Sequence, residues 1–454
     1  MCVWDCVRVI VNECRSVQYS QQSAVRSSKS HSYLREAVVA IPLDQPFDVA
    51  AIRRDFPILE QRLAGDLPLI YLDTAATSQK PSSVISKVIE CYEQYNSNVH
   101  RGIHQLGDRM TTELELTREK IRHFLGAREA DEIVFTSGTT MSINLVAHGW
   151  ARKFLTVGDE ILVNPMEHHA NLVPWQLAAS ASGAVLRHIP LTAEGCLDLN
   201  QLDNVLTRRT RLVAVTAMSN VLGTINPIDL LARRAHDVGA LICVDGAQSV
   251  SHSPTNVCSS SIDFLAFSGH KLYGPTGIGV LYARRELLDA MDPFLTGGHM
   301  IREVTLASST WADPPAKFEA GTCPFIEAVG LGAAIDYVEK LGFDRILRHE
   351  SELSARAHER LALIPGLTIY GPEIEKKGAI LSFTVDRVHP HDLSDLLDRR
   401  GIAIRAGHHC TMPLHEHLQL TATARASFAF YNTLAEIDAL ADAIQAARKV
   451  FRLA

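Results

Sequence analysis

Two stretches near the middle of the chain decide its fold, LICVDGAQ (residues 241–248) and FLAFSGHKLYGPTGIGVLY (residues 264–282). Each begins with a continuous run of aliphatic or aromatic residues, which is typical of a strand buried on both faces of a parallel sheet. Each run leads directly into a polar segment that contains Asp245 or Lys271. Because open parallel sheets bind ligands beyond the carboxyl ends of their strands, these two residues mark the expected site.

Similar apolar runs precede these two stretches and alternate with helix-length segments. They are EIVFTS (132–137), EILVNP (160–165) and RLVAVTAM (211–218). This alternation predicts an α/β fold with a mostly parallel sheet covered by helices on both faces. Towards the C-terminus, a strand pair (GAILSFTV, 378–385, and GIAIRAG, 401–407) lies among helical segments and predicts a smaller α+β unit.

These patterns divide the chain into a large α/β domain over residues 66–310 and a small α+β domain over residues 311–454. Residues 48–65 are expected to pack on the small domain. Residues 1–47 are rich in Ser and Gln and show no lasting period, which predicts a disordered extension. Their composition partly fits an organellar targeting peptide, but Asp5 and Glu13 argue against one, so we expect a cytoplasmic protein.

The composition excludes several classes of protein. The 454 residues carry a net charge of -7 without a sustained Lys/Arg stripe, so nucleic acid is not an expected partner. No apolar run is long enough for a membrane-spanning helix. The nine cysteines are scattered without a CxxC pair, which favours a reducing compartment over a disulfide framework.

Polar residues follow several of the predicted strands. Thr139 and Thr140 open a helix after Gly138, where free backbone N–H groups could hold a phosphate, although a threonine N-cap explains them as well. His168, in MEHHAN, could stack on an aromatic ligand, bind a metal or only satisfy a loop. Asn220 could donate to a ligand oxygen or form an ordinary Asx turn.

Asp245 and Lys271 give a sharper indication. A carboxylate at the end of a buried strand requires a cation or several donors, although N-capping of the next helix is an alternative. Partial burial lowers the pKa of a lysine and makes its amine able to form a Schiff base. Together with a phosphate-holding turn and a stackable histidine, this pair matches the needs of pyridoxal phosphate, whose aldehyde binds lysine and whose ring nitrogen is kept protonated by aspartate.

The stretch IRAGHHCTMPL (404–414) brings Arg405, His408, His409 and Cys410 together. It could be a metal site, a nucleophilic thiol or an unremarkable loop. Adjacent residues of an extended segment point to opposite sides, so the sequence disfavours a zinc ion bound by all three His and Cys side chains. Positive charge on the two histidines and the arginine would stabilise a Cys410 thiolate.

Several motifs occur in one order and resemble the SufS-like (group II) cysteine desulfurases, within the class-V aminotransferase family of fold-type I pyridoxal phosphate enzymes. The resemblance covers residues 48–454 and implies an aspartate-aminotransferase-like fold. The motifs are LDTAATSQKP, YNSNVHRGIH, TSGTTMSINLVA, MEHHANLVPWQ, VDGAQ, AFSGHKLYGPTGIGVLY and RAGHHCTMPL.

The resemblance implies a role for each candidate residue. Lys271 corresponds to the lysine that binds the cofactor aldehyde, Asp245 to the partner of the ring nitrogen, and His168 to the stacking histidine that helps proton transfer. Gln248 and Asn220 correspond to contacts of the phenolic oxygen, Asn220 also lying near the substrate, and Arg425 to the group that pairs with the substrate carboxylate. The implied phosphate ligands are Thr139, Thr140, Ser268 and His270, with Thr322 reaching the phosphate of the partner subunit in a homodimer.

The implied activity is the removal of sulfur from L-cysteine. Lys271 acts as the base at the α-carbon, and Cys410 receives the sulfur as a persulfide, leaving L-alanine. A SufE-like or SufU-like acceptor protein then takes the sulfur for iron-sulfur cluster assembly. Selenocysteine lyase, cysteine sulfinate desulfinase, kynureninase-like hydrolase and epimerase activities are alternatives on the same fold, and a non-catalytic scaffold is a further one.

Two positions depart from the family pattern. Cys323-Pro324-Phe325 follows FEAGT, where relatives continue with Pro, Asn and small residues, so the packing between subunits around Thr322 is in question. Cys323 is expected to be a small buried apolar residue and not a second nucleophile. Thr74, in LDTAAT, stands where relatives also carry Asn or Ser.

Overall fold

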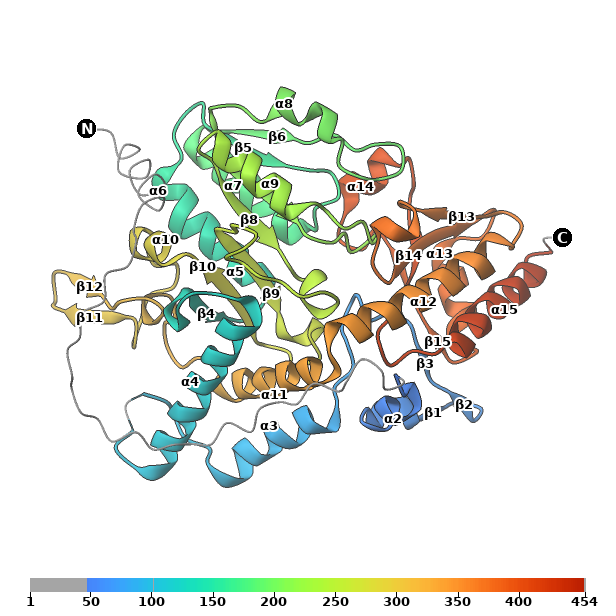
Figure 1. Ribbon diagram of the computed structural model, residues 1–454, viewed down its shortest axis with the longest axis horizontal. Helices are drawn as coiled ribbons and strands as arrows, with labels where there is room; N and C mark the ends of the chain where they lie inside the picture. Colours follow the sequence, from blue (N-terminus) through green and yellow to red (C-terminus); the bar gives the residue numbers. More distant parts are fainter. Residues whose placement is uncertain (1–46, 101, 453–454) are drawn as a thin grey trace. The chain divides into compact units, whose positions relative to one another are not determined.

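The computed structural model describes residues 47–100 and 102–452. Apart from Phe47, the predicted N-terminal extension lies outside the described residues. Figure 1 shows a large sheet with its helices and, next along the chain, a smaller sheet formed by C-terminal residues.

The large sheet has seven strands in the order β4-β10-β9-β8-β7-β5-β6. Only β10 runs antiparallel to its neighbours, so the predicted, mostly parallel α/β fold is confirmed. All of the strand-forming runs predicted for this sheet occur in it. The bounds are β4 Ile133–Thr136, β5 Glu160–Val163, β6 Val185–His188, β7 Thr210–Thr216, β8 Leu241–Asp245, β9 Phe264–Ser268 and β10 Gly279–Ala283.

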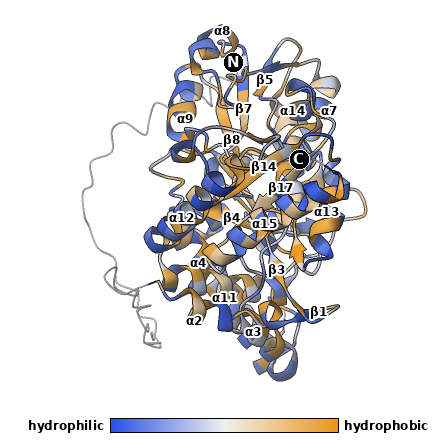
Figure 2. Cartoon of the chain, turned by 90° about the vertical axis from the view of Figure 1, so that its right-hand side faces the viewer, coloured by the Kyte–Doolittle hydropathy of each residue, from blue (hydrophilic) through white to orange (hydrophobic). Residues whose placement is uncertain are grey.

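Successive residues of these strands alternate between two separate apolar cores. In β8, for example, Ile242 and Val244 belong to one core, and Leu241 and Cys243 belong to the other. Except for the edge strand β6, the strands therefore bury both faces, which explains why they read as continuous apolar runs. Figure 2 shows the central strands β7 and β8 mainly in the hydrophobic colour.

Different helices cover the two faces of the sheet. The helices α4 (Gln105–Leu125), α9 (Ile228–Asp237) and α11 (Phe325–Leu341) contribute to the first core. The second core receives α5 (Thr139–Val146), α7 (Val173–Ser182) and α10 (Arg285–Ala290). Helix α3 (Ser82–Gln94) packs with α4 against α11. Shorter elements complete this part, namely α6 Arg152–Phe154, α8 Leu202–Val205, β11 Ile301–Val304 and β12 Ser309–Trp311.

The C-terminal sheet has the antiparallel order β13-β14-β17-β16. Both predicted segments contain strands of this sheet, but the two are not adjacent, because β17, which was not predicted, lies between β14 and β16. Residues 401–407 also divide into two strands, and β15 pairs in parallel with β3 instead. The bounds are β3 Ile70–Tyr71, β13 Leu367–Tyr370, β14 Ile380–Val385, β15 Ile402–Ala403, β16 Arg405–Gly407 and β17 Thr423–Ser427.

Helices α12 (Phe343–Ala362), α13 (Pro390–Asp398) and α15 (Leu434–Val450) pack on this sheet and on one another around a third apolar core. Helix α14 (Met412–His417) follows the segment that holds Cys410. At the N-terminal side, α2 (Val49–Arg54) places the Arg53 guanidinium against the Tyr431 carbonyl at 2.7 Å and the Glu436 carboxylate at 2.9 Å. The short strands β1 (Arg62–Leu63) and β2 (Leu67–Pro68) form a hairpin.

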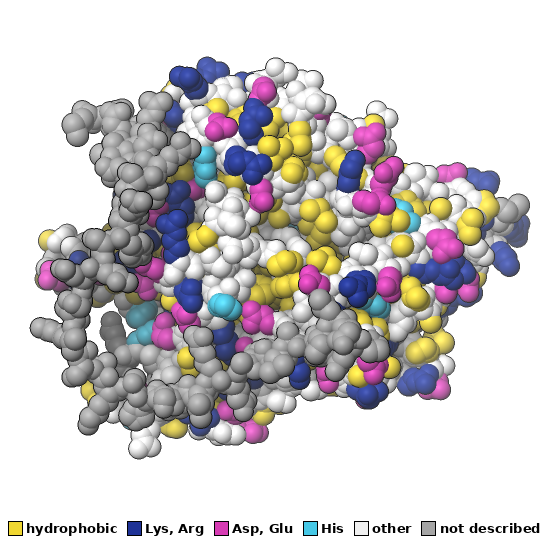
Figure 3. Space-filling view, in the orientation of Figure 1, with side chains coloured by type: hydrophobic (Ala, Val, Ile, Leu, Met, Phe, Trp, Pro, Cys, Tyr) yellow, Lys and Arg dark blue, Asp and Glu magenta, His cyan; other side chains and the backbone are white. Residues whose placement is uncertain are grey.

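Within the part of the chain that the structure describes, every helix is too short or too polar to cross a membrane. On the face drawn in Figure 3, basic and acidic side chains are intermixed with apolar ones.

Candidate active site

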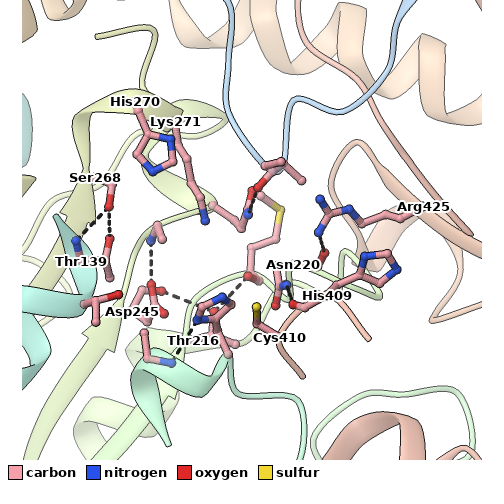
Figure 4. Close-up of a pocket in the computed structure, with 18 of the residues that line it drawn as sticks. Thr139, Thr216, Asn220, Asp245, Ser268, His270, Lys271, His409, Cys410 and Arg425 are labelled. Carbon is pink, nitrogen blue, oxygen red and sulfur yellow. Dashed lines mark hydrogen bonds between the residues drawn. The ribbon is translucent and has the colours of Figure 1, made fainter. Parts of the chain in front are cut away.

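A cavity of ≈ 300 Å³ lies beyond the carboxyl ends of the central strands of the large sheet, and residues of the C-terminal part line its other side. Of the residues predicted for the site, Thr322 alone is missing from the lining. The structure brings together Thr139, Thr140, His168, Asn220, Asp245, Gln248, Ser268, His270, Lys271, Cys410 and Arg425, most of which Figure 4 shows.

Asp245 and Lys271 provide opposite charges inside this buried space. Asp245 is the last residue of β8, and Lys271 ends the short 3-10 turn that follows β9. Burial raises the pKa of Asp245, while the Ala247 amide and the Lys271 ammonium act against that rise. Burial also lowers the pKa of Lys271 to about 8. A substantial fraction of Lys271 amine is therefore neutral near physiological pH and can act as a nucleophile or base.

The turn between β4 and α5 forms a cradle of donors beside Ser268. The Thr139 amide donates to Ser268 Oγ at 2.8 Å, and the two hydroxyl oxygens lie 2.7 Å apart. Gly138 has φ 152°, and a Cβ on Gly279 of β10 would come within 2.3 Å of Gly138 Cα, so glycine is required at both positions. The eight-residue helix α5 begins here, with its first-turn amides at the cavity.

The His168 ring is held neutral and in one tautomer. Its Nδ1 accepts a hydrogen bond from the Ala170 amide at 3.0 Å, so the neutral ring carries its proton on Nε2. Burial, followed by the nearby Lys271, lowers the pKa of His168 to about 4. The ring can therefore face an aromatic ligand and offer one N–H donor to it.

Three residues missed by the sequence reasoning fix the carbonyl immediately before Lys271. The His270 carbonyl accepts from the Thr77 hydroxyl at 3.0 Å, from the Ser78 amide at 3.1 Å and from Lys80 Nζ at 2.9 Å. The Ser78 hydroxyl also donates to it at 3.0 Å. The polar side chains of TSQK in the LDTAATSQKP motif were the available signal, but nothing local to that motif indicates a carbonyl so distant in sequence.

Two arginines share one carboxylate at the side of the cavity opposite the sheet. Arg425 donates to Asp73 Oδ1 at 3.1 Å and to the Asn220 carbonyl at 2.9 Å, and its Nε has no hydrogen-bond partner among the described residues. Arg405 approaches both oxygens of Asp73, the shortest distance being 2.9 Å. Asp73 was not among the predicted site residues, although it belongs to the LDTAAT motif.

Cys410 lies in a tight turn and is exposed to the cavity mouth. His409 and Cys410 both have left-handed backbone conformations, with φ of 51° and 57°. The expectation that this segment is extended is therefore wrong. Within residues 47–100 and 102–452, no three metal-ligating side chains are grouped so that they could hold a metal ion. Asn220 stabilises the turn, because its Nδ2 donates to the His409 carbonyl at 2.8 Å.

His409 does not supply the positive charge expected of it. Burial, followed by Arg425, lowers the pKa of His409 to about 2, so the ring is neutral at physiological pH. Its Nε2 lies 2.9 Å from Thr423 Oγ1, which also lies 3.2 Å from His415 Nε2. His415 Nδ1 lies 3.0 Å from the Thr411 carbonyl, which can only accept, so the neutral His415 ring carries its proton on Nδ1 and accepts at Nε2. The Thr423 hydroxyl therefore donates to His415, and the neutral His409 ring donates from Nε2 to Thr423.

The remaining predicted positions lie outside the cavity. Thr322 is exposed and does not line the cavity. Cys323 is partly buried against the main core, and burial raises the pKa of its thiol to about 12, in agreement with an apolar role. Phe325 begins α11. The Thr74 hydroxyl lies 2.8 Å from the Tyr431 hydroxyl.

Comparison with known proteins agrees with this geometry. Residues 70–440 match the model of the aminotransferase class-V family. A probable cysteine desulfurase from Streptomyces coelicolor is 49% identical over 409 residues, which are 89% of this chain and 98% of that protein.

Two solved structures share the fold over most of their length. The cysteine desulfurase CsdA from Escherichia coli, an S-sulfonic acid form, superposes with a TM-score of 0.83 at 41% identity, covering 89% of this chain and 100% of that one. The apo cysteine desulfurase from Thermococcus onnurineus gives 0.84 at 40% identity, covering 88% and 98%. The expected fold-type I architecture is thereby confirmed, and the chain belongs to the aminotransferase class-V family.

Proposed function

We propose that this protein is a pyridoxal phosphate-dependent cysteine desulfurase, which removes sulfur from L-cysteine and leaves L-alanine. The observation that carries the proposal is one cavity lined by a half-buried lysine with a lowered pKa, a buried aspartate and an exposed cysteine (Figure 4). Relatives that are 47–50% identical over most of the chain carry the same name.

The donor set fits the proposed cofactor. Lys271 can bind the aldehyde, and the Asp245 carboxylate, with a single backbone donor on one oxygen, can accept the proton of the ring nitrogen. His168 can cover the ring, and Gln248 with Asn220 can contact its phenolic oxygen. The phosphate fits the cradle of Thr139, Thr140, Ser268 and His270 at the start of α5. When bound, pyridoxal phosphate accepts the electrons released at the substrate α-carbon.

The chain's own residues supply the acid, base and nucleophile. Lys271 would act as the base at the substrate α-carbon, because burial lowers its pKa to about 8 and leaves a fraction of its amine neutral near physiological pH. The Cys410 thiolate attacks the substrate sulfur. The substrate carbon–sulfur bond breaks as the new sulfur–sulfur bond forms, so the Cys410 sulfur is oxidised to a persulfide and the β-carbon is reduced and protonated to the methyl group of alanine.

Arg425 is the proposed partner of the substrate carboxylate. It is 2% exposed and lines the cavity, and its Nε has no hydrogen-bond partner among the described residues. The planar guanidinium suits a carboxylate, and its hydrogen bond to Asp73 holds it in place.

Selenocysteine lyase or cysteine sulfinate desulfinase activity is the alternative on this fold. These substrates carry better leaving groups, so they need not use Cys410. A Cys410→Ala variant assayed with both L-cysteine and L-selenocysteine tests the proposal. Loss of alanine formation from cysteine, with retained cofactor absorption, supports it, whereas undiminished turnover of cysteine contradicts the role of Cys410.

The proposal includes the partners and the domain roles. Exposed Cys410 suits sulfur transfer to a SufE-like or SufU-like protein for iron-sulfur cluster assembly. A homodimer would cover exposed apolar side chains in and near α3 and α4 and bring Thr322 to the partner's phosphate. These side chains are Ile85, Ile89, Tyr92, Ile103, Leu106 and Leu116.

Residues 66–310 would form the cofactor-binding domain, and residues 311–454 would form the small domain with Cys410. Residues 48–65 would pack against the small domain, and the whole protein would lie in the cytoplasm.

Light scattering of the purified protein measures the mass of the proposed homodimer directly. A mass equal to one chain at micromolar concentration would contradict it.

A further inference from the structure

The second histidine of MEHHAN holds the Cys410 turn from both sides. The backbone amide of His169 donates to the carbonyl of Cys410 at 2.8 Å. Its ring Nε2 accepts a hydrogen bond from the amide of Met412 at 3.1 Å. One residue of the large-sheet part therefore contacts the peptide groups on both sides of Thr411, directly beside the proposed nucleophile.

These two contacts satisfy groups that otherwise lack partners. Met412 is the first residue of α14, and the first-turn amides of a helix have no acceptor within it. His409 and Cys410 adopt left-handed conformations, which are unfavourable for residues with side chains and persist only where surrounding contacts maintain them. Asn220 and His169 provide such contacts at successive carbonyls of this turn.

The protonation state of the ring is fixed by its partner. A backbone amide can only donate, so His169 Nε2 must carry a lone pair and the neutral ring holds its proton on Nδ1. Burial, followed by the neighbouring His408, lowers the pKa of His169 and keeps the ring in this neutral form. The ring also lies beside His168, the residue placed over the cofactor.

We infer that His169 is a positioning residue for sulfur transfer, which sets the backbone of Cys410 so that its sulfur meets the substrate sulfur. The inference rests on the proposed role of Cys410 as nucleophile. It also connects two functions in adjacent residues, because His168 is proposed to cover the cofactor while His169 holds the proposed nucleophile. Misplacing a reacting atom by about 1 Å can lower a rate about 10²-fold.

The test compares four variants of the full-length protein loaded with pyridoxal phosphate. His169→Ala removes the acceptor, and His169→Phe removes it while keeping a ring of similar size. His169→Gln restores an acceptor through its side-chain oxygen. His417→Ala is the matched control, because His417 is an exposed histidine of α14, the helix whose first residue donates to the His169 ring.

The readouts are the single-turnover rate of persulfide formation on Cys410, mapped by mass spectrometry, and the visible absorption of the bound cofactor. We expect His169→Ala and His169→Phe to form persulfide about 10²-fold more slowly with unchanged cofactor absorption. His169→Gln should recover most of the rate, and His417→Ala should match the wild type. Recovery in His169→Gln would not occur if the ring served only to fill space.

Two outcomes would overturn the inference. One is wild-type persulfide formation in His169→Phe, and the other is a loss of cofactor absorption equal to the loss of rate. A Cys410→Ala variant measured alongside separates this inference from the function it rests on. Undiminished cysteine desulfuration in Cys410→Ala refutes the proposed function, whereas its loss together with a normal rate in the His169 variants refutes the positioning role alone.

Discussion

Asp73 holds two arginines at the side of the cavity opposite the sheet, and replacing it with asparagine removes one negative charge with little change in volume. Arg425 is 2% exposed and retains only neutral acceptors after this change, namely the Asn220 carbonyl and the amide oxygen of the new side chain. Arg405 is half exposed, so water can compensate most of its loss. Asp73→Asn therefore leaves one buried guanidinium without a counterion.

Removing one partner of a buried ion pair typically costs about 3–5 kcal/mol, and an exposed pair contributes about 1 kcal/mol or less. We expect Asp73→Asn to lower the free energy of unfolding by about 3–5 kcal/mol, nearly all of it through Arg425. Alanine formation from cysteine should also fall, because Arg425 loses the contact that orients it.

The assay is denaturant unfolding of the cofactor-loaded protein, followed by circular dichroism and paired with alanine release. Asp395→Asn is the control, since it removes an exposed pair with Arg399 whose side chains are 60% and 70% exposed. That variant should change stability by less than about 1 kcal/mol. Equal unfolding midpoints for the two variants would refute the reasoning, because Asp73 would then contribute no more than a surface carboxylate.

Three further predictions concern the cofactor cradle, the histidine chain and pH. Ser268→Ala removes the hydroxyl beside Thr139 and should weaken pyridoxal phosphate binding by about tenfold or more, measured by dialysis and visible absorption; unchanged retention contradicts the cradle. Thr423→Val leaves the His409 and His415 rings without their shared hydroxyl and should lower the free energy of unfolding, measured with denaturant, by about 1–3 kcal/mol. An unchanged free energy of unfolding would show that these hydrogen bonds do not stabilise the protein. Burial lowers the pKa of His168 from 6.5 to about 4, so between these two pH values the unfolded chain binds a proton at His168 that the folded protein does not. The free energy of unfolding should therefore fall as the pH drops from 6.5 to about 4. His168→Asn should flatten this dependence.

The large sheet and the side of the cavity that it forms could be predicted, because the local sequence determines both. Strands buried on both faces read as apolar runs, and Asp245 and Lys271 stand directly after two of those runs. The register of a parallel sheet then brings both residues to one edge. No long-range contact had to be guessed to place them together.

The C-terminal side of the cavity could not be predicted in the same way. Strand β17 reads TARAS, and its buried Arg425 is compatible with a core strand only because Asp73, 352 residues earlier, neutralises it. The strand order and the neutral state of His409 likewise depend on partners distant in sequence. Periodicity carries no information about such pairs, so Asp73 and β17 were missed.

The destination of the substrate sulfur shows whether Cys410 is the nucleophile. The cofactor-loaded protein is mixed with one equivalent of sulfur-labelled L-cysteine, alanine is quantified, and the Cys410 peptide is analysed by mass spectrometry without reductant. If Cys410 is the sulfur acceptor, one labelled sulfur atom should be found on Cys410 for each alanine formed, and none on Cys323. Alanine formed with no labelled sulfur on Cys410 would contradict this role.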